Sequence, residues 1–91
     1  MLILTSSQRN RFSRLAHKLK PVVYIGKAGF TEKILLATDQ ALEAHELIKI
    51  KFIDFKAQKQ EISAQLAQDL DAILVRIIGN IAILFRKKKK M

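Results

Sequence analysis

The chain has 91 residues, a length that fits one compact domain and leaves little room for a deep catalytic cleft. Hydrophobic residues make up 49% of it and the formal net charge is +9, so we expect a folded, basic domain and not a disordered segment. No cysteine occurs, which excludes disulfides, thiolate metal sites and thiol nucleophiles. The apolar start, residues 1–4, is too short for a signal peptide or a membrane span, so we expect a cytoplasmic, soluble protein.

The positive charge is concentrated at the two ends of the sequence. Residues 1–30 carry six basic residues and no acidic one, whereas residues 31–85 carry six basic residues against all eight acidic ones. The five remaining bases are Arg86 and the four lysines that follow it. A near-neutral body with two basic ends favours a polyanionic partner such as RNA.

The first predicted element is a helix over residues 6–18. Its apolar residues recur at helical spacing and form one stripe: Phe12, Leu15, Ala16 and Leu19. Three basic residues form a ridge on a separate flank: Arg11, Arg14 and Lys18. An ordinary solvated helix face is the alternative, but such faces usually mix both signs of charge. We therefore favour a ridge that binds a polyanion.

A strand is expected over residues 22–25, because Pro21 ends the helix and β-branched or aromatic residues follow it. The run is entirely apolar, so we expect burial on both faces, with Tyr24 in the core in preference to stacking on a base. A tight loop then leads into a helix over residues 31–45, which Thr31 can cap.

The rest of the chain predicts one more helix and three strands: a strand over 47–52, a helix over about 58–70, and strands over 73–78 and 81–85. Gly79 and Asn80 are typical of a type II′ hairpin. Lys49 and Lys51 alternate with apolar residues, so they occupy a solvated strand face that can also serve as an accessory RNA surface. The order α-β-α-β-α-β-β predicts an α/β domain with a mixed four-stranded sheet and three helices.

The loop Gly26-Lys27-Ala28-Gly29 is the sharpest candidate binding site. Its glycines let the backbone turn tightly and approach a ligand closely, and its amides precede the positive end of a helix, so phosphate is the expected guest. Lys27 adds a charge, as in the GXXG loops that clamp nucleotides. The alternative is that both glycines serve only the turn. Phe30, after the loop, either contacts a base or fills the core.

Enzymatic chemistry finds little support. His17 and His45 fall at the ends of different helices, with no metal-ligand spacing, serine elbow or nucleotide-binding P-loop beside them. We therefore expect a binding protein without catalytic residues, metal, cofactor or small-molecule substrate.

A different reading rests on the C-terminal lysine run. We expect one domain over residues 1–86 and a flexible basic tail over residues 87–91. Such a run can also bind an anionic membrane surface or an acidic protein, so a peripheral binder of that kind is the alternative function.

Four blocks of sequence carry a family resemblance: residues 15–21, 23–31, 41–51, and 78–79 leading to 84–86. In this order they resemble the YhbY-like proteins, the stand-alone bacterial form of the CRM domain (chloroplast RNA splicing and ribosome maturation). The resemblance covers residues 5–86, nearly everything that is expected to fold.

The resemblance implies a sheet similar to that in the C-terminal domain of the third bacterial translation initiation factor. It also implies that the protein binds RNA with the loop and an adjoining basic surface, in which Lys18 and Lys20 match the family's basic block. Separately, we expect a monomer. Bacterial members are associated with precursors of the large ribosomal subunit, so ribosomal RNA is the implied partner. Asp71 stands where the family pattern has a helix-ending glycine, a tolerable change because aspartate can adopt left-handed geometry.

Overall fold

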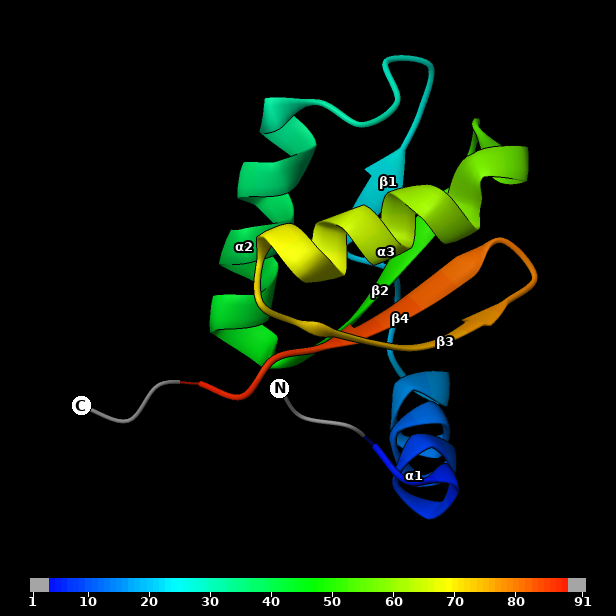
Figure 1. Cartoon of the computed structure of the whole chain (residues 1–91), viewed down its shortest axis with the longest axis vertical. Helices are drawn as coiled ribbons and strands as arrows, with labels where there is room; N and C mark the ends of the chain where they lie inside the picture. Colours follow the sequence, from blue (N-terminus) through cyan, green and yellow to red (C-terminus); the bar gives the residue numbers. More distant parts are fainter. Residues whose placement is uncertain (1–3, 89–91) are drawn as a thin grey trace.

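A mixed four-stranded sheet forms the centre of the structure, a computed structural model that describes residues 4–88 (Figure 1). The strands are β1 (Val23–Ile25), β2 (Leu47–Phe52), β3 (Ile73–Ile78) and β4 (Ile81–Phe85). They lie in the order β1-β2-β4-β3, with β1 parallel to β2 and the other neighbouring pairs antiparallel. The predicted mixed sheet is confirmed, and β1 is one residue shorter than expected.

Three α-helices are present, as predicted: α1 (Ser6–His17), α2 (Glu32–His45) and α3 (Lys59–Asp69), the last preceded by the 3₁₀ turn η1 (Lys56–Gln58). α1 begins with a capping box, in which the Thr5 hydroxyl accepts a hydrogen bond from the Gln8 amide and the Gln8 side chain accepts one from the Thr5 amide. Thr31 caps α2 as expected, accepting from the Ile34 amide at 3.2 Å.

Left-handed backbone geometry occurs at two chain reversals that the sequence indicated. Asp71 follows α3 with φ at 53°, so aspartate adopts the left-handed conformation there. Gly79 has φ at 57° whereas Asn80 does not have a positive φ, which agrees with the predicted type II′ hairpin between β3 and β4.

The main core lies between the sheet and the helices α2 and α3. Its largest fully buried side chains include Phe52, Ile25 and Leu42. Phe30 packs against this core and is partly buried, which agrees with the interpretation of this residue as a core plug.

α1 packs on the opposite face of the sheet, over β3, β4 and part of β2. Its docking site is a second, smaller cluster of buried residues: Leu4, Ala16, Val75 and Ile83. Phe12 packs against this cluster, with its ring centroid 4.4 Å from that of Phe85. The predicted apolar stripe is correct for Phe12 and Ala16 and wrong for Leu15 and Leu19, which are 55% and 39% exposed.

The expectation that β1 is buried on both faces is wrong, and so is the placement of Tyr24 in the core. β1 is the edge strand of the sheet, and Tyr24 is 51% exposed between the buried residues Val23 and Ile25. The physical reason is that α1 docks over the far half of this face and leaves the outward side of β1 uncovered.

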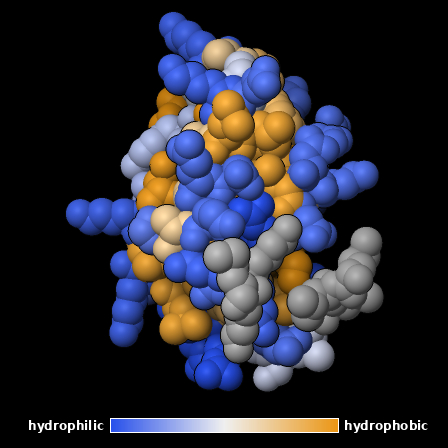
Figure 2. Space-filling view, turned by 90° about the vertical axis from the view of Figure 1, so that its left-hand side faces the viewer, coloured by the Kyte–Doolittle hydropathy of each residue, from blue (hydrophilic) through white to orange (hydrophobic). Residues whose placement is uncertain are grey.

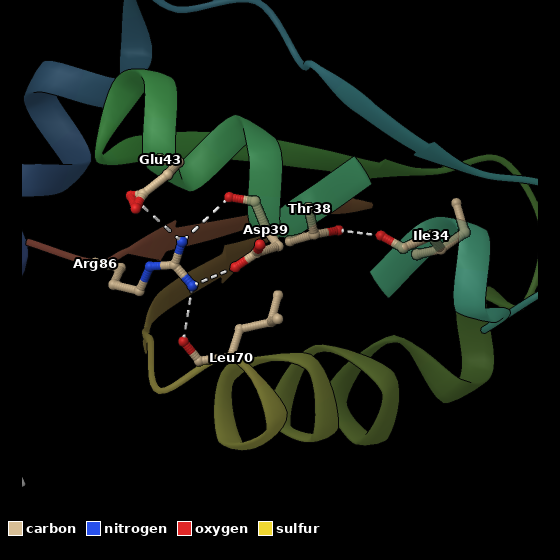
Figure 3. A network of polar contacts seen from close by, with 6 residues as sticks. All are labelled: Ile34, Thr38, Asp39, Glu43, Leu70 and Arg86. Carbon is tan, nitrogen blue, oxygen red and sulfur yellow. Dashed lines mark hydrogen bonds and ion pairs between the residues drawn. The ribbon is translucent and has the colours of Figure 1, made fainter. Parts of the chain in front are cut away.

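Arg86 belongs to the folded body and not to a free basic tail. Its guanidinium donates hydrogen bonds to the Asp39 carboxylate at 2.8 Å, to the Asp39 carbonyl at 3.1 Å and to the Leu70 carbonyl at 3.0 Å (Figure 3). Its backbone amide also donates to the Glu46 carbonyl at 2.9 Å. Arg86 thereby joins the end of β4 to α2 and to the end of α3, so its charge is already engaged within the protein.

Candidate nucleic-acid interface

The loop between β1 and α2 is a tight turn in which the two glycines have different roles. The Gly29 amide donates to the Gly26 carbonyl at 2.9 Å. Gly29 has φ at 69°, and a Cβ there would lie 3.1 Å from two ring carbons of Phe55. At Gly26 an added Cβ would meet no atom within 4 Å. The turn therefore requires glycine at position 29 only.

Lys27 and Ala28 form the exposed tip of this loop. Within residues 4–88, the amides of Lys27 and Ala28 make no hydrogen bond, so both remain available to a ligand. Beside them lies a shallow groove of about 360 Å³, lined by Lys27, Asp54, Phe55 and Gln58. The tip thus offers backbone donors and one ammonium group next to an aromatic ring, a combination suited to a phosphate and its nucleoside.

A second candidate site lies along α1. Arg11, Arg14 and Lys18 are all exposed, as the predicted ridge requires. Arg14 also lines an open groove of about 510 Å³, which is otherwise lined by Ser7, Asn10, Ser13, His17 and Arg76. Arg76 of β3 donates to the Asn10 side chain at 2.8 Å, which holds a second guanidinium beside the helix. This groove presents polar side chains and two arginines.

The loop and α1 lie at opposite ends of the long axis of the molecule (Figure 1). The sequence leads one to expect the basic ridge next to the loop, because only about ten residues separate them. Instead β1 runs away from the end of α1 and carries the loop to the other end of the sheet (Figure 1). The two sites therefore do not form one continuous binding surface, and a ligand must be extended to contact both.

The remaining candidate lysines are dispersed. Lys49 is not a free surface charge, because its ammonium group donates to the Leu19 carbonyl at 3.0 Å, just after the end of α1. Lys51 is exposed on the α1 face of the sheet. Lys20 is exposed and lines an apolar groove with Leu19 and Val22.

Sequence reasoning placed Tyr24 in the core and did not consider Arg76. Tyr24 is exposed although it lies in an apolar run, and nothing in that run shows that β1 is an edge strand. Arg76 carried a usable signal, because a lone arginine in the otherwise apolar stretch of residues 73–78 marks a point where the strand meets solvent.

The side of the molecule that carries α2 differs in charge from the loop tip and from α1. Figure 2 views the side that carries α2, where hydrophobic patches lie between protruding hydrophilic side chains. α2 mixes acidic and basic residues, including Glu32, Lys33 and Glu43, and exposes Leu36. This side lacks the single sign of charge that a polyanion site requires.

Other kinds of site find no support in the part of the chain that the structure describes. Residues 4–88 contain no group of three His, Cys, Asp or Glu side chains placed to hold a metal ion. No helix in this range is long and apolar enough to cross a membrane. His17 and His45 are the last residues of α1 and α2, at the helix ends where they were predicted.

The chain is similar to known proteins over almost its whole length. A Pseudomonas aeruginosa protein named as a probable RNA-binding protein is 37% identical over 98% of this chain and 86% of its own length. An RNA-binding protein of Haemophilus influenzae is 36% identical over 99% and 92%. The solution structure of a Staphylococcus aureus protein superposes with a TM-score of 0.82 at 31% identity, covering 97% of this chain and 93% of the other.

The model of the CRS1/YhbY (CRM) domain family matches residues 4–86, which span almost the whole described structure. Together with these relatives, the match shows that the chain belongs to the CRS1/YhbY (CRM) domain family.

Proposed function

We propose that this protein is a non-enzymatic RNA-binding protein that contacts the RNA backbone through the loop tip and the basic flank of α1. The observation that carries the proposal is the distribution of charge over the fold. α1 and all four strands contain no acidic residue, and the acids lie on α2, α3 and their connecting segments. On the sheet face that bears α1, the helix and the strands therefore contribute only positive charge, which suits a polyanion. The names of the P. aeruginosa and H. influenzae relatives support RNA as that polyanion.

We further propose that the RNA is ribosomal and that the protein acts in the cytoplasm, as a monomer, on precursors of the large ribosomal subunit. Membership of the family supports this proposal, since the family model matches residues 4–86 and bacterial members of the family are associated with precursors of the large ribosomal subunit. The two separated sites suit an extended contact on a structured RNA, with Lys27 at one end and Arg11 and Arg14 at the other.

RNA binding by phosphate contacts has a specific salt dependence. We expect the logarithm of the association constant for a ribosomal RNA fragment to fall linearly with the logarithm of salt concentration, by about 0.7–0.9 for each neutralised phosphate. Replacement Lys27→Glu should weaken binding strongly and reduce the slope by about one. Fluorescence anisotropy of labelled RNA over a salt series measures both quantities.

The matched control is Lys87→Glu, which makes the same change of charge outside the loop. If both variants weaken binding equally, net charge holds the RNA and the loop has no special role. An affinity of the unaltered protein that does not depend on salt contradicts the proposal as a whole.

The ribosomal part of the proposal has its own test. Crosslinking in cells, followed by sequencing of the attached RNA, should recover large-subunit ribosomal RNA. The protein should sediment with large-subunit precursors in a sucrose gradient. Recovery of unrelated RNAs, with the protein at the top of the gradient, contradicts this part and leaves general RNA binding intact.

A further inference from the structure

A row of four side chains crosses all four strands on the α1 face of the sheet. The register pairs Tyr24 with Lys51, Lys51 with Ile81, and Ile81 with Ile78. Neighbouring strands lie about 4.8 Å apart, so the row spans roughly 14 Å. We call these four residues the open row.

The open row faces away from the main core, because the residues next to it in sequence point the other way. Val23 and Ile25 flank Tyr24 and are buried in the main core, as are Phe52 beside Lys51 and Ala82 beside Ile81. α1 covers a different part of this face. As a result Tyr24 is 51% and Ile78 54% exposed, and Lys51 is exposed between them.

The charged side chains on the α1 face of the sheet, around the open row, are positive; Asp54 lies past the end of β2, where its amide donates to the Ile25 carbonyl at 3.1 Å. Lys51 lies within it, and Arg76 lies two residues before Ile78 on the same strand, beside the α1 groove that Arg14 also lines. Neither α1 nor any strand contributes an acidic residue. An aromatic and apolar surface with these cations beside it suits a nucleic-acid strand, whose bases stack on the ring while its phosphates meet the cations.

The position of the row also explains how the two separated basic sites can act together. Tyr24 precedes Gly26 by two residues and so lies next to the loop. Arg76 of β3 lines the α1 groove. RNA that contacts both the loop tip and the groove must pass over the sheet between them.

Resting on the proposed RNA binding, we infer that the open row is a platform for single-stranded RNA and that an unpaired base stacks on the Tyr24 ring. Lys51, on the neighbouring strand, neutralises a phosphate next to this base, and Arg76, on the far edge strand, neutralises one further along the RNA. The platform gives the protein a preference for unpaired over paired RNA that the loop and the ridge alone do not supply, because a duplex keeps its bases stacked internally.

The composition of the chain makes a direct test possible. Tyr24 is the only tyrosine and there is no tryptophan, so intrinsic fluorescence reports on this ring alone. Titration with a short single-stranded RNA of mixed sequence should quench the fluorescence by stacking, after correction against free tyrosine amide in the same RNA. The duplex formed with the complementary strand should bind through its phosphates and leave the fluorescence largely unchanged.

Substitutions separate the ring from its surroundings. Tyr24→Leu should lower the affinity for the single-stranded RNA about tenfold, the loss of one base–aromatic stack, whereas Tyr24→Phe should retain most of it. Leu36→Ala, at an exposed apolar residue of α2, is the control and should change nothing. Because Tyr24 and Leu36 are 51% and 57% exposed, thermal unfolding of the three variants should stay close to that of the parent protein.

The possible failures are distinct. Salt-dependent RNA binding that Tyr24→Leu leaves unchanged, or equal quenching by duplex and single strand, overturns the platform and leaves the proposed function standing. The absence of any RNA binding by the parent protein overturns the proposed function itself.

Discussion

At the scale of single residues, the two glycines of the loop face different constraints. Gly29 combines a left-handed backbone with close contact to the Phe55 ring, so the fold itself requires glycine there. Gly26 has free space around the position of a side chain. The fold does not require glycine at Gly26, and we propose close approach of a ligand as its role.

The first prediction follows from this contrast. Gly29→Ala should lower the free energy of unfolding by about 1–2 kcal/mol, because alanine is disfavoured in left-handed geometry and its Cβ crowds Phe55. Gly26→Ala should leave stability unchanged or raise it by up to about 1 kcal/mol, yet weaken RNA binding. Urea unfolding and RNA titration of both variants test this. Unchanged RNA affinity in Gly26→Ala means that glycine at Gly26 serves no close approach.

At the scale of elements, the docking of α1 depends on polar contacts as well as on its small apolar contribution. Arg9 donates to the carbonyls of Leu74 and Val75, at 2.9 and 2.5 Å, where β3 has an irregular register. Lys49 holds the other end of the helix through the Leu19 carbonyl. Basic residues that look equivalent in the sequence of α1 therefore have different roles, and the role of Arg9 is structural.

Arg9 and Arg11 form a matched pair for the second prediction. Arg9→Ala should lower the free energy of unfolding by about 1–3 kcal/mol, because it removes a charged donor and leaves two partly buried carbonyls without it. Arg11→Ala should change stability by less than about 0.5 kcal/mol, since Arg11 is exposed, but should weaken RNA binding. Denaturant unfolding with RNA titration separates the two effects, and equal destabilisation of both variants would refute the assignment.

At the scale of the whole molecule, Arg86 marks the point where the folded body ends. It ties β4 to α2 and α3, whereas Lys87 is exposed and the Lys88 amide donates to the Glu46 carboxylate at 2.8 Å. Residues 89–91 lie outside the described part of the chain, so the predicted tail over residues 87–91 stays a prediction.

Deletion of residues 87–91 should leave the unfolding transition nearly unchanged and weaken RNA binding only modestly, through the loss of phosphate neutralisation. Deletion of residues 86–91 should in addition destabilise the fold by about 1–2 kcal/mol, because Asp39 and the Leu70 carbonyl lose their partner. Thermal unfolding and RNA titration of both truncations test this. Complete loss of RNA affinity on removing residues 87–91 would instead favour the tail as the principal polyanion site.

The secondary structure of this protein was largely predictable because each element carries its own period and end signals. β2, β3 and β4 have the expected bounds, and Thr31 and Asp71 mark the start of α2 and the end of α3 as predicted. The order of strands in the sheet depends on long-range pairing between β2 and β4, which no local pattern reveals.

The errors share this physical cause. The burial of Tyr24 and the distance between loop and ridge both depend on where β1 and α1 lie in the sheet. The tight turn over the loop was predicted correctly, since glycine spacing is a local signal. Its tip, Lys27 and Ala28, is exposed, whereas Gly29 is buried. A local signal cannot, however, show which other surface faces the same ligand.

The irregular register of β3 has a consequence for the seating of α1. Opposite β4, the pairing passes from Leu74 directly to Arg76, so β3 carries one residue more than its partner and Val75 is the extra one. Both Val75 and Arg76 then contact the helix. Val75 is buried in the cluster with Ala16, and Arg76 donates a hydrogen bond to the Asn10 side chain. A regular strand alternates its side chains and would offer α1 only one of these anchors. The extra residue in β3 thus lets a helix with few apolar residues dock on the sheet. A deletion of one residue from β3 would weaken this docking even if every remaining side chain were kept.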